Sequence, residues 1–131
     1  MKKKNDDYEV KKGIDGLGLF AKRDFSKGEF VIEYTGEKIT TEEANRRGGM
    51  YLFEVNKKWH VDGKGRENTA RYINHSCIPN CEVDIKKGRI LISTLKKIQK
   101  GDEFVYDYGK EFYNEFIKPK GCRCKKHTKT A

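Results

Sequence analysis

The segment from Arg71 to Cys81 constrains the fold of this chain more than any other. It reads Arg-Tyr-Ile-Asn-His-Ser-Cys-Ile-Pro-Asn-Cys, and asparagine and proline interrupt both helices and strands. Its Asn, His, Ser and Cys side chains are hydrogen-bonding groups or metal ligands. So dense a polar cluster, flanked by apolar residues typical of strands, predicts a functional site rather than a simple connection.

Short apolar segments with aromatic or β-branched residues predict strands along the sequence. These segments lie at 17–21, 30–34, 51–55, 59–61, 83–85, 89–94 and 103–108. Lys87-Gly88, between two of them, predicts a hairpin turn. One helix is predicted after Thr40, which forms a capping box with Glu43, and Gly48-Gly49 ends that segment. A shorter helical piece is predicted at 68–73, so the fold class is mainly β with short helices.

Two segments of the chain resemble each other. Residues 25–31 and residues 98–105 each run from an apolar residue through a turn with glycine to an acidic entry into a strand. They predict two similar strand–turn–strand units packed in one core, and a chance match is the alternative for so short a pattern.

Length and composition limit the class of protein. The chain has 131 residues, 37% of them charged, a net charge of +9 and a mean hydropathy of −0.92, which predicts one domain with a modest core. No apolar run is long enough for a membrane span, and none follows the basic start as in a secretory signal. We therefore expect a cytoplasmic or nuclear protein without a membrane partner. Its positive charge suits a nucleic-acid partner and equally a solubilising lysine coat.

A short glycine motif precedes the first predicted strand. Gly16-Leu17-Gly18 offers bare backbone N–H and C=O groups to which a ligand can come close. A simple tight turn is the alternative. The motif lacks the third glycine and the long helix of a dinucleotide-binding fingerprint, so a Rossmann-type site is excluded.

Two tyrosines stand out near the end of the last predicted strand. Tyr106 and Tyr108 flank Asp107, so on a strand both phenols face one side. Paired hydroxyls and ring faces on one wall suit a narrow channel for a long cationic side chain. The more common role of a tyrosine is half-buried packing.

The cysteines form a possible metal set. Cys122 and Cys124 are too close in sequence to form a disulfide readily, and His127 follows them. With Cys77 they make a Cys₃His set suited to tetrahedral zinc, and Cys81 is an alternative ligand. Four reduced cysteines without a metal are the other interpretation.

Taken in order, these motifs resemble the SET-domain protein lysine methyltransferases. The matching segments are the Asn-His-Ser-Cys-x-Pro-Asn-Cys run that begins at Asn74, Tyr106-Asp107-Tyr108, Gly16-Leu17-Gly18, Glu33-Tyr34-Thr35-Gly36-Glu37 and 61–72. The last of these is similar to the family pattern Val-Asp-Ala-x-x-x-Gly-Asn-x-Ala-Arg-Phe. The resemblance extends from about Lys12 to Cys124.

The resemblance implies a SET fold and a domain plan. The fold is β-clip-like, with several small curled sheets and the signature run threaded as a pseudoknot. A flexible N-terminus at 1–11 would precede a SET domain at 12–117, and a post-SET-like cysteine tail would occupy 118–131. The tail ligands depart from the family pattern because His127 stands for a third cysteine.

The same resemblance implies an activity, namely transfer of methyl groups from S-adenosylmethionine to a protein lysine. The substrate is expected to be a histone or another basic chromatin-like protein, methylated mainly once. Tyr108 would be the catalytic tyrosine, Tyr106 would limit the number of methyl groups, and Tyr51 would add a channel wall. The implied cofactor-binding residues are Gly16, Leu17, Gly18, Arg71, Asn74, His75 and Tyr108. The implied zinc ligands are Cys77, Cys122, Cys124 and His127.

Three departures and three alternatives accompany this reading. Gly63 stands for the family's Ala, Glu67 for its Gly, and Gly65 lies where many members carry an aromatic residue against the cofactor. From chemistry alone His75 is also a candidate general base. The other functional classes are a basic zinc-containing nucleic-acid-binding module and a non-catalytic SET interaction module.

Overall fold

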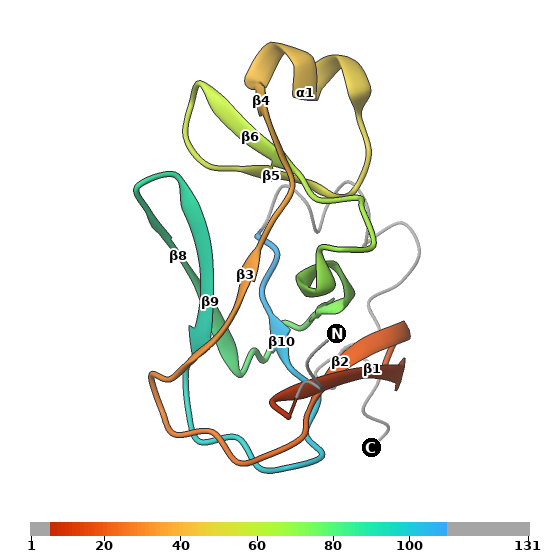
Figure 1. Cartoon of the computed structure of the whole chain (residues 1–131), viewed down its shortest axis with the longest axis vertical. Coiled ribbons are helices and arrows are strands. Elements are labelled where there is room, and N and C mark those ends of the chain that lie inside the picture. Colours follow the sequence, from red (N-terminus) through yellow and green to blue (C-terminus); the bar gives the residue numbers. More distant parts are fainter. Residues whose placement is uncertain (1–5, 110–131) are drawn as a thin grey trace, which may run out of the picture.

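The structure is a computed structural model that describes residues 6–109 (Figure 1). Its elements in chain order are β1 (Tyr8–Gly13), β2 (Gly16–Ala21), β3 (Phe30–Tyr34), β4 (Glu37–Thr40), α1 (Thr41–Arg47), β5 (Leu52–Glu54), β6 (Trp59–Asp62), the 3₁₀ helix η1 (Thr69–Tyr72), β7 (Asn74–His75), β8 (Cys81–Lys86), β9 (Arg89–Thr94) and β10 (Val105–Tyr106). Within these residues the strands form small sheets in the orders β1-β2, β3-β9-β8, β4-β6-β5 and β10-β7. The predicted class, mainly β with short helices in several small sheets, is confirmed.

The sheet of β3, β9 and β8 supplies most of the core. Along β9 the side chains alternate, so that Ile90, Ile92 and Thr94 are buried. Fully burying an isoleucine stabilises a fold by about 1.5–3 kcal/mol. The predicted turn between β8 and β9 is confirmed, since Lys87 and Gly88 have φ of 51° and 77°, as a tight two-residue hairpin requires.

The predicted helix α1 is also confirmed. The Thr40 hydroxyl accepts a hydrogen bond from the Glu43 N–H at 3.1 Å, which satisfies a free donor of the first turn. At the other end Gly48 has φ of 63°, and glycine adopts this left-handed conformation without steric cost. Figure 1 shows α1 with β4, β5 and β6 at one end of the molecule, beyond β3 and β10.

The signature run is held beside the end of the described chain. β7 pairs in parallel with β10, so Asn74 lies opposite Val105 and His75 opposite Tyr106. Asn80 strengthens this junction: its amide nitrogen donates to the Glu103 carbonyl at 2.8 Å, and its amide oxygen accepts from the Val105 N–H at 2.9 Å. The Asn80 side chain thus takes the place of a neighbouring strand for the Glu103 carbonyl and the Val105 N–H.

Several predicted boundaries are wrong. Residues 8–11, expected to lie in a flexible N-terminus, belong to β1, which pairs with β2 over its whole length. The strand expected at 103–108 is reduced to 105–106, because Asp107 accepts the Gly109 N–H at 2.9 Å and turns the chain. The predicted end of the domain at 117 and the tail at 118–131 lie outside the described residues. No helix within residues 6–109 is long and apolar enough to cross a bilayer.

The two similar segments contact each other. Phe25 and Ile98 exchange both backbone hydrogen bonds, at 2.8 and 3.0 Å. The ring of Phe25 also packs edge-on against Phe104, with centroids 5.3 Å apart. All three side chains are almost fully buried, so the prediction that both units share one core is confirmed.

Candidate functional site

Tyr108 is fixed to the signature run at two points. Its backbone N–H donates to Nδ1 of His75 at 3.1 Å, and its hydroxyl donates to the carbonyl oxygen of Ile73. Its ring lies 5.4 Å from the His75 ring and 4.9 Å from the Tyr106 ring. The bond to Tyr108 makes Nδ1 of His75 an acceptor, so this histidine holds the tyrosine in place, whereas the resemblance implied that it binds the cofactor.

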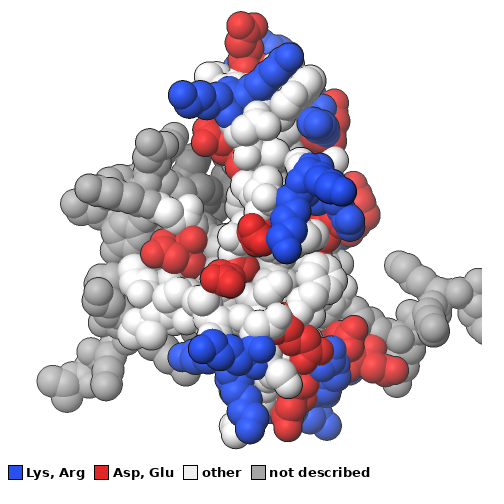
Figure 2. Space-filling view, turned by 90° about the vertical axis from the view of Figure 1, so that its left-hand side faces the viewer, with Lys and Arg blue, Asp and Glu red and all other residues white. Residues whose placement is uncertain are grey.

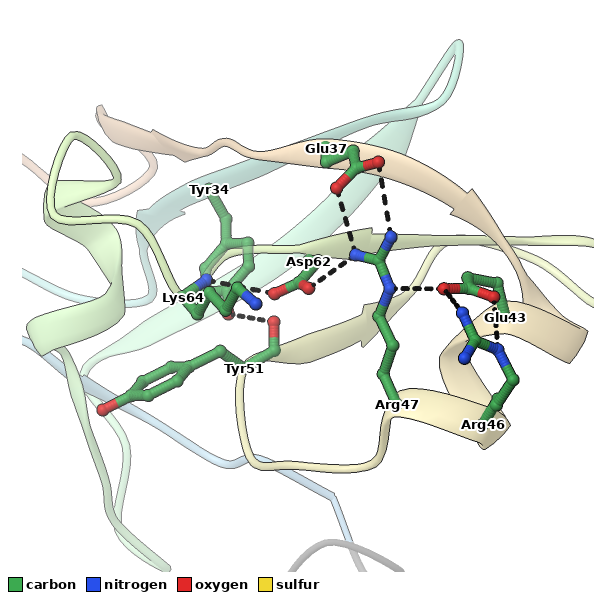
Figure 3. Close-up of polar contacts among 8 residues, drawn as sticks. All are labelled: Tyr34, Glu37, Glu43, Arg46, Arg47, Tyr51, Asp62 and Lys64. Carbon is green, nitrogen blue, oxygen red and sulfur yellow. Dashed lines mark hydrogen bonds and ion pairs between the residues drawn. The ribbon is translucent and has the colours of Figure 1, made fainter.

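Two further tyrosines come from β3 and from the segment that precedes β5. The Tyr34 hydroxyl, on β3, donates to the Tyr51 carbonyl oxygen at 2.8 Å, and the Gly63 N–H donates to the same oxygen at 2.8 Å. The guanidinium of Arg71 lies 4.5 Å from the centre of the Tyr51 ring. Tyr51 is therefore held at its backbone by hydrogen bonds and at its ring by a cation–π contact. Figure 3 shows Tyr34 reaching toward the Tyr51 backbone while the Tyr51 ring points away from α1.

The tyrosines form one electrostatically linked group. Burial raises the pKa of Tyr34 and Tyr108 well above the ordinary value, and neighbouring phenols add to the effect. Burial likewise raises the pKa of Tyr106. At neutral pH these phenols are therefore protonated, and each can donate a hydrogen bond but cannot act as a base. The charges of Asp15 and Glu103 also raise the Tyr108 pKa, which places both carboxylates within electrostatic range of the phenol.

The predicted cofactor-binding glycines lie beside Asn74. The Asn74 amide nitrogen donates to the Leu17 carbonyl at 3.1 Å. A Cβ atom on Gly18 would lie 3.2 Å from the same nitrogen. Gly16 has φ of 74° and opens β2 after a two-residue turn. The structure thus brings Gly16, Leu17 and Gly18 next to the signature run, 57 residues away in sequence.

Residues 16–109, which include these tyrosines, glycines and Asn74, match the SET domain. The chain belongs to the SET-domain family. Histone-lysine N-methyltransferase 2D of Homo sapiens is 40% identical over 124 residues, which cover 86% of this chain. Histone-lysine N-methyltransferase trr of Drosophila melanogaster is 39% identical over 117 residues, or 80% of the chain. The H3 lysine-4 specific histone-lysine N-methyltransferase of Emericella nidulans is 37% identical over 112 residues, or 76%.

These relatives are much longer proteins. The SET chain described here spans 2% of the human protein, 5% of the Drosophila protein and 9% of the Emericella protein. The similarity therefore concerns one domain of each relative.

Arg71 lies on the tyrosine side of this SET site. Its guanidinium packs on Tyr51 and, at 5.3 Å, on the Tyr72 ring. Hydrogen bonding with the Tyr51 side chain raises the pKa of Arg71 further. Its Nε is the one buried side-chain nitrogen or oxygen within residues 6–109 that lacks a hydrogen-bond partner. The resemblance gave Arg71 a role in cofactor binding, and in the structure it stacks on the rings of Tyr51 and Tyr72.

The cysteines of the SET site differ in environment. Cys77 is half-buried, and its Sγ lies 3.2 Å from Nε2 of His75. Cys81 is 1% exposed, and burial raises its pKa to about 12, which opposes the thiolate form that a metal requires. Cys77 is therefore the better ligand of the two. The other predicted ligands, Cys122, Cys124 and His127, lie outside the described residues, and residues 6–109 alone contain no group of three or more metal-ligating side chains.

Sequence reasoning missed two members of the SET site, Tyr34 and Glu103. Tyr34 lies in a recognised motif, but its function was not assigned. The sequence signal that could have pointed to Tyr34 is Gly63. A Cβ atom at Gly63 would lie closer than 3.0 Å to the Tyr34 ring and to the Asn68 amide. The departure from the family's alanine thus makes room for Tyr34. Asn68 joins the two sides, accepting from the Thr35 N–H at 3.0 Å and donating to the Gly63 carbonyl at 2.9 Å.

Proposed function

We propose that this SET domain transfers methyl groups from S-adenosylmethionine to the side-chain amine of a protein lysine. The observation that carries the proposal is that Tyr34 and Tyr51 lie within electrostatic range of the packed pair Tyr106 and Tyr108, while Asn74 contacts the glycine hairpin. The tyrosines form an aromatic wall suited to a cationic side chain, and Asn74 and the hairpin offer amide and backbone groups suited to a polar ligand. The names of the relatives support a histone as the substrate, with histone H3 the first to test.

The residues present fit the cofactor. Asn74 offers an amide oxygen, and the hairpin carries bare backbone at Gly16 and Gly18. When bound, S-adenosylmethionine supplies a methyl group on a positively charged sulfur. The tyrosine rings accept such a charge through their π faces.

The tyrosines would align the amine and exclude water. A free lysine amine has a pKa near about 10.4 and must lose a proton before it attacks. The neutral phenols cannot take that proton, so its loss depends on burial of the amine and on nearby positive charge, both of which lower the amine pKa. The Tyr108 hydroxyl and the Ile73 carbonyl that it binds form a polar edge on an otherwise aromatic wall. Such an edge holds the amine in one orientation, which favours in-line transfer.

Monomethylation is the proposed main outcome. Tyr106 is 7% exposed and packs on Tyr108 with ring centroids 4.9 Å apart. Its hydroxyl can hold the amine or a water molecule in the space that a second methyl group needs. A phenylalanine there would leave that space open.

Zinc binding by the tail remains a proposal. Cys77 would provide one ligand and Cys122, Cys124 and His127 the others, in a tetrahedral set. Cys77 is the less buried of the two described cysteines. Metal analysis of protein purified without chelator should find about one zinc per chain, and Cys124→Ser should lose it.

Contact with nucleic acid or nucleosomes is proposed for the terminal segments rather than for the body. Acidic and basic residues almost balance within 6–109, so nearly all of the net charge of +9 comes from residues 1–5 and 110–131. On the face that Figure 2 shows, Lys and Arg side chains lie among Asp and Glu and form no continuous basic field. We propose a nuclear or chromatin role on this basis, with a salt-dependent contact.

The decisive experiment is methyl transfer from labelled S-adenosylmethionine to recombinant histone H3 and to other basic proteins. Tyr108→Phe should lower kcat by at least about a hundredfold while cofactor affinity changes little, because the hydroxyl acts on the transition state. Tyr8→Phe, at the far end of β1 from the glycine turn, is the matched control. Full turnover in Tyr108→Phe would refute the assignment of the channel. Cofactor binding without any transfer would favour a non-catalytic SET interaction module. Binding of nucleic acid alone would favour the nucleic-acid module.

A further inference from the structure

The Glu103 carboxylate joins the glycine hairpin to the signature run. Its Oε1 accepts the Ile14 N–H at 3.0 Å, in the turn between β1 and β2. Its Oε2 accepts from the Asn74 amide nitrogen at 2.8 Å. One carboxylate therefore holds together two segments that are 60 residues apart in the numbering of the chain, and neither contact uses a regular strand pairing.

These contacts determine which way the Asn74 amide faces. Its nitrogen donates to the Leu17 carbonyl at 3.1 Å and to Glu103 at 2.8 Å. Both partners are acceptors only, so the NH₂ group must face them. The amide oxygen is left on the other side, where no group among residues 6–109 donates to it.

Two glycines leave room for this carboxylate. A Cβ atom on Gly13 or on Gly18 would lie closer than 3.0 Å to a carboxylate oxygen of Glu103. The backbone of Glu103 is also fixed, because Asn80 binds its carbonyl at 2.8 Å and Phe20 pairs with it across a β-bridge. The carboxylate is thus confined between the hairpin and Asn74, and Gly18 is needed for Glu103 as well as for any ligand.

We propose that Glu103 is a positioning residue of the cofactor pocket, which orients the Asn74 amide so that its oxygen faces the ligand. The inference rests on the proposed function. A pocket that presents an oxygen at this point selects a hydrogen-bond donor, and a ligand ammonium group is the strongest such donor. A glutamine at 103 could accept only one of the two bonds, and its own NH₂ group would then face either Ile14 or Asn74. The Leu17 carbonyl alone would then hold the Asn74 amide in its orientation.

The test compares two nucleosides that differ in the amino-acid portion. S-adenosylhomocysteine carries an ammonium group, whereas 5′-methylthioadenosine keeps the nucleoside and the sulfur but lacks that group. Measured by calorimetry, Glu103→Gln should weaken the binding of S-adenosylhomocysteine by about tenfold or more. It should weaken the binding of 5′-methylthioadenosine by less than about twofold. The exposed Glu82 on β8 provides the control, and Glu82→Gln should change neither affinity.

If Glu103→Gln weakened the binding of both nucleosides equally, the inference would be overturned, because Glu103 would then only support the hairpin. Unchanged affinity for S-adenosylhomocysteine would overturn it as well.

A measurement without ligand separates this inference from the proposed function. In ¹⁵N-labelled protein the side-chain NH₂ of Asn74 should exchange slowly with water, and in Glu103→Gln at least about tenfold faster. Identical exchange in the two proteins would overturn the role of Glu103. If the unmutated chain binds neither nucleoside, the proposed function fails, and the exchange rates still decide whether Glu103 orients Asn74.

Discussion

The Tyr34 hydroxyl donates a hydrogen bond of 2.8 Å to the Tyr51 carbonyl and so ties β3 to the loop that precedes β5. The same carbonyl accepts the Gly63 N–H, so the Tyr51 backbone is fixed both by β3 and by the residue that follows β6. The Tyr51 ring then lies on Arg71. The position of this proposed channel wall therefore depends on a residue that lies 17 positions earlier in the chain.

Replacing Tyr34 by Phe should weaken methyl transfer through the position of Tyr51. The ring and its packing remain, but one buried hydrogen bond of about 0.5–1.5 kcal/mol is lost. We expect kcat/KM for a lysine peptide to fall by up to about tenfold, with unchanged cofactor affinity. Peptide kinetics alongside Tyr8→Phe would measure this. A Tyr34→Phe enzyme with normal kinetics would show that Tyr51 does not need this anchor.

Replacing Tyr106 by Phe should raise the number of methyl groups added. The hydrogen bond lost is worth about 0.5–1.5 kcal/mol, which corresponds to roughly a tenfold shift between successive products. The first methylation should proceed nearly as before, and di- and trimethyl-lysine should accumulate. Mass spectrometry of one peptide over time gives the distribution. Ready trimethylation by the unmutated enzyme would contradict the proposed limit.

Arg47 binds three carboxylates that belong to three elements (Figure 3). It contacts Glu43 at 2.7 Å in α1, Glu37 at 3.0 Å in β4 and Asp62 at 2.9 Å in β6. Because the Asp62 side chain is only 6% exposed, Arg47→Met should leave a poorly solvated carboxylate and lower the free energy of unfolding by about 1–3 kcal/mol. Arg46→Met is the matched control, since Arg46 is 74% exposed and pairs only with Glu43 among the ion pairs of residues 6–109.

Urea unfolding of both variants would measure the difference, and Arg46→Met should stay within about 0.5 kcal/mol of the unmutated protein. The effect of Arg47 should also depend on pH. Arg46 and Arg47 lower the pKa of Glu43, so this stabilisation is present above the ordinary carboxyl pKa and is lost as pH falls through the lowered value. The difference in free energy of unfolding between Arg47→Met and the unmutated chain should therefore become smaller in acid. An equal difference at pH 3 and pH 7 would exclude this ionic origin.

The two cysteines of the signature run should react at very different rates. Burial raises the pKa of Cys81 to about 12, whereas Cys77 is half-exposed. At pH 8, in a Cys122→Ser/Cys124→Ser background, iodoacetamide should label Cys77 and leave Cys81 unmodified in the folded protein. The Cys81 thiol stabilises the fold below the ordinary thiol pKa, and this contribution is lost as pH rises toward about 12. Peptide mapping would detect labelling, and equal modification of both thiols would contradict the burial of Cys81.

Local sequence patterns predicted the elements whose physics is local. β3 and β9 were predicted with their observed bounds, because each is a short apolar segment rich in β-branched residues between turn residues. The helix α1 was marked by its cap, and the hairpin at Lys87-Gly88 by its glycine. In these cases the signal and the structure lie within a few residues of each other.

The missed elements depend on partners that their own sequence pattern does not reveal. β1 carries charged and exposed residues along most of its length, so it has no apolar pattern, and it is a strand only because β2 lies beside it. Glu103 looks like an ordinary acidic strand residue until the fold brings Ile14 and Asn74 to its carboxylate. The resemblance to the SET family supplied the tyrosines and Asn74, but the hydrogen bond between Tyr34 and Tyr51 became visible only in three dimensions.

The pairing of residues 19–25 with residues 98–104 has a consequence for how the protein folds. Phe25 pairs with Ile98, Ala21 with Asp102 and Leu19 with Phe104, and the Glu103 bond to Ile14 spans 89 positions. Such distant pairings require large loops to close before any contact rewards them, which slows folding. A nascent chain that has not yet exposed residues 98–106 can form the β1–β2 hairpin but cannot seat the signature run. The proposed catalytic pocket therefore cannot form before residues 98–106 are available to pair.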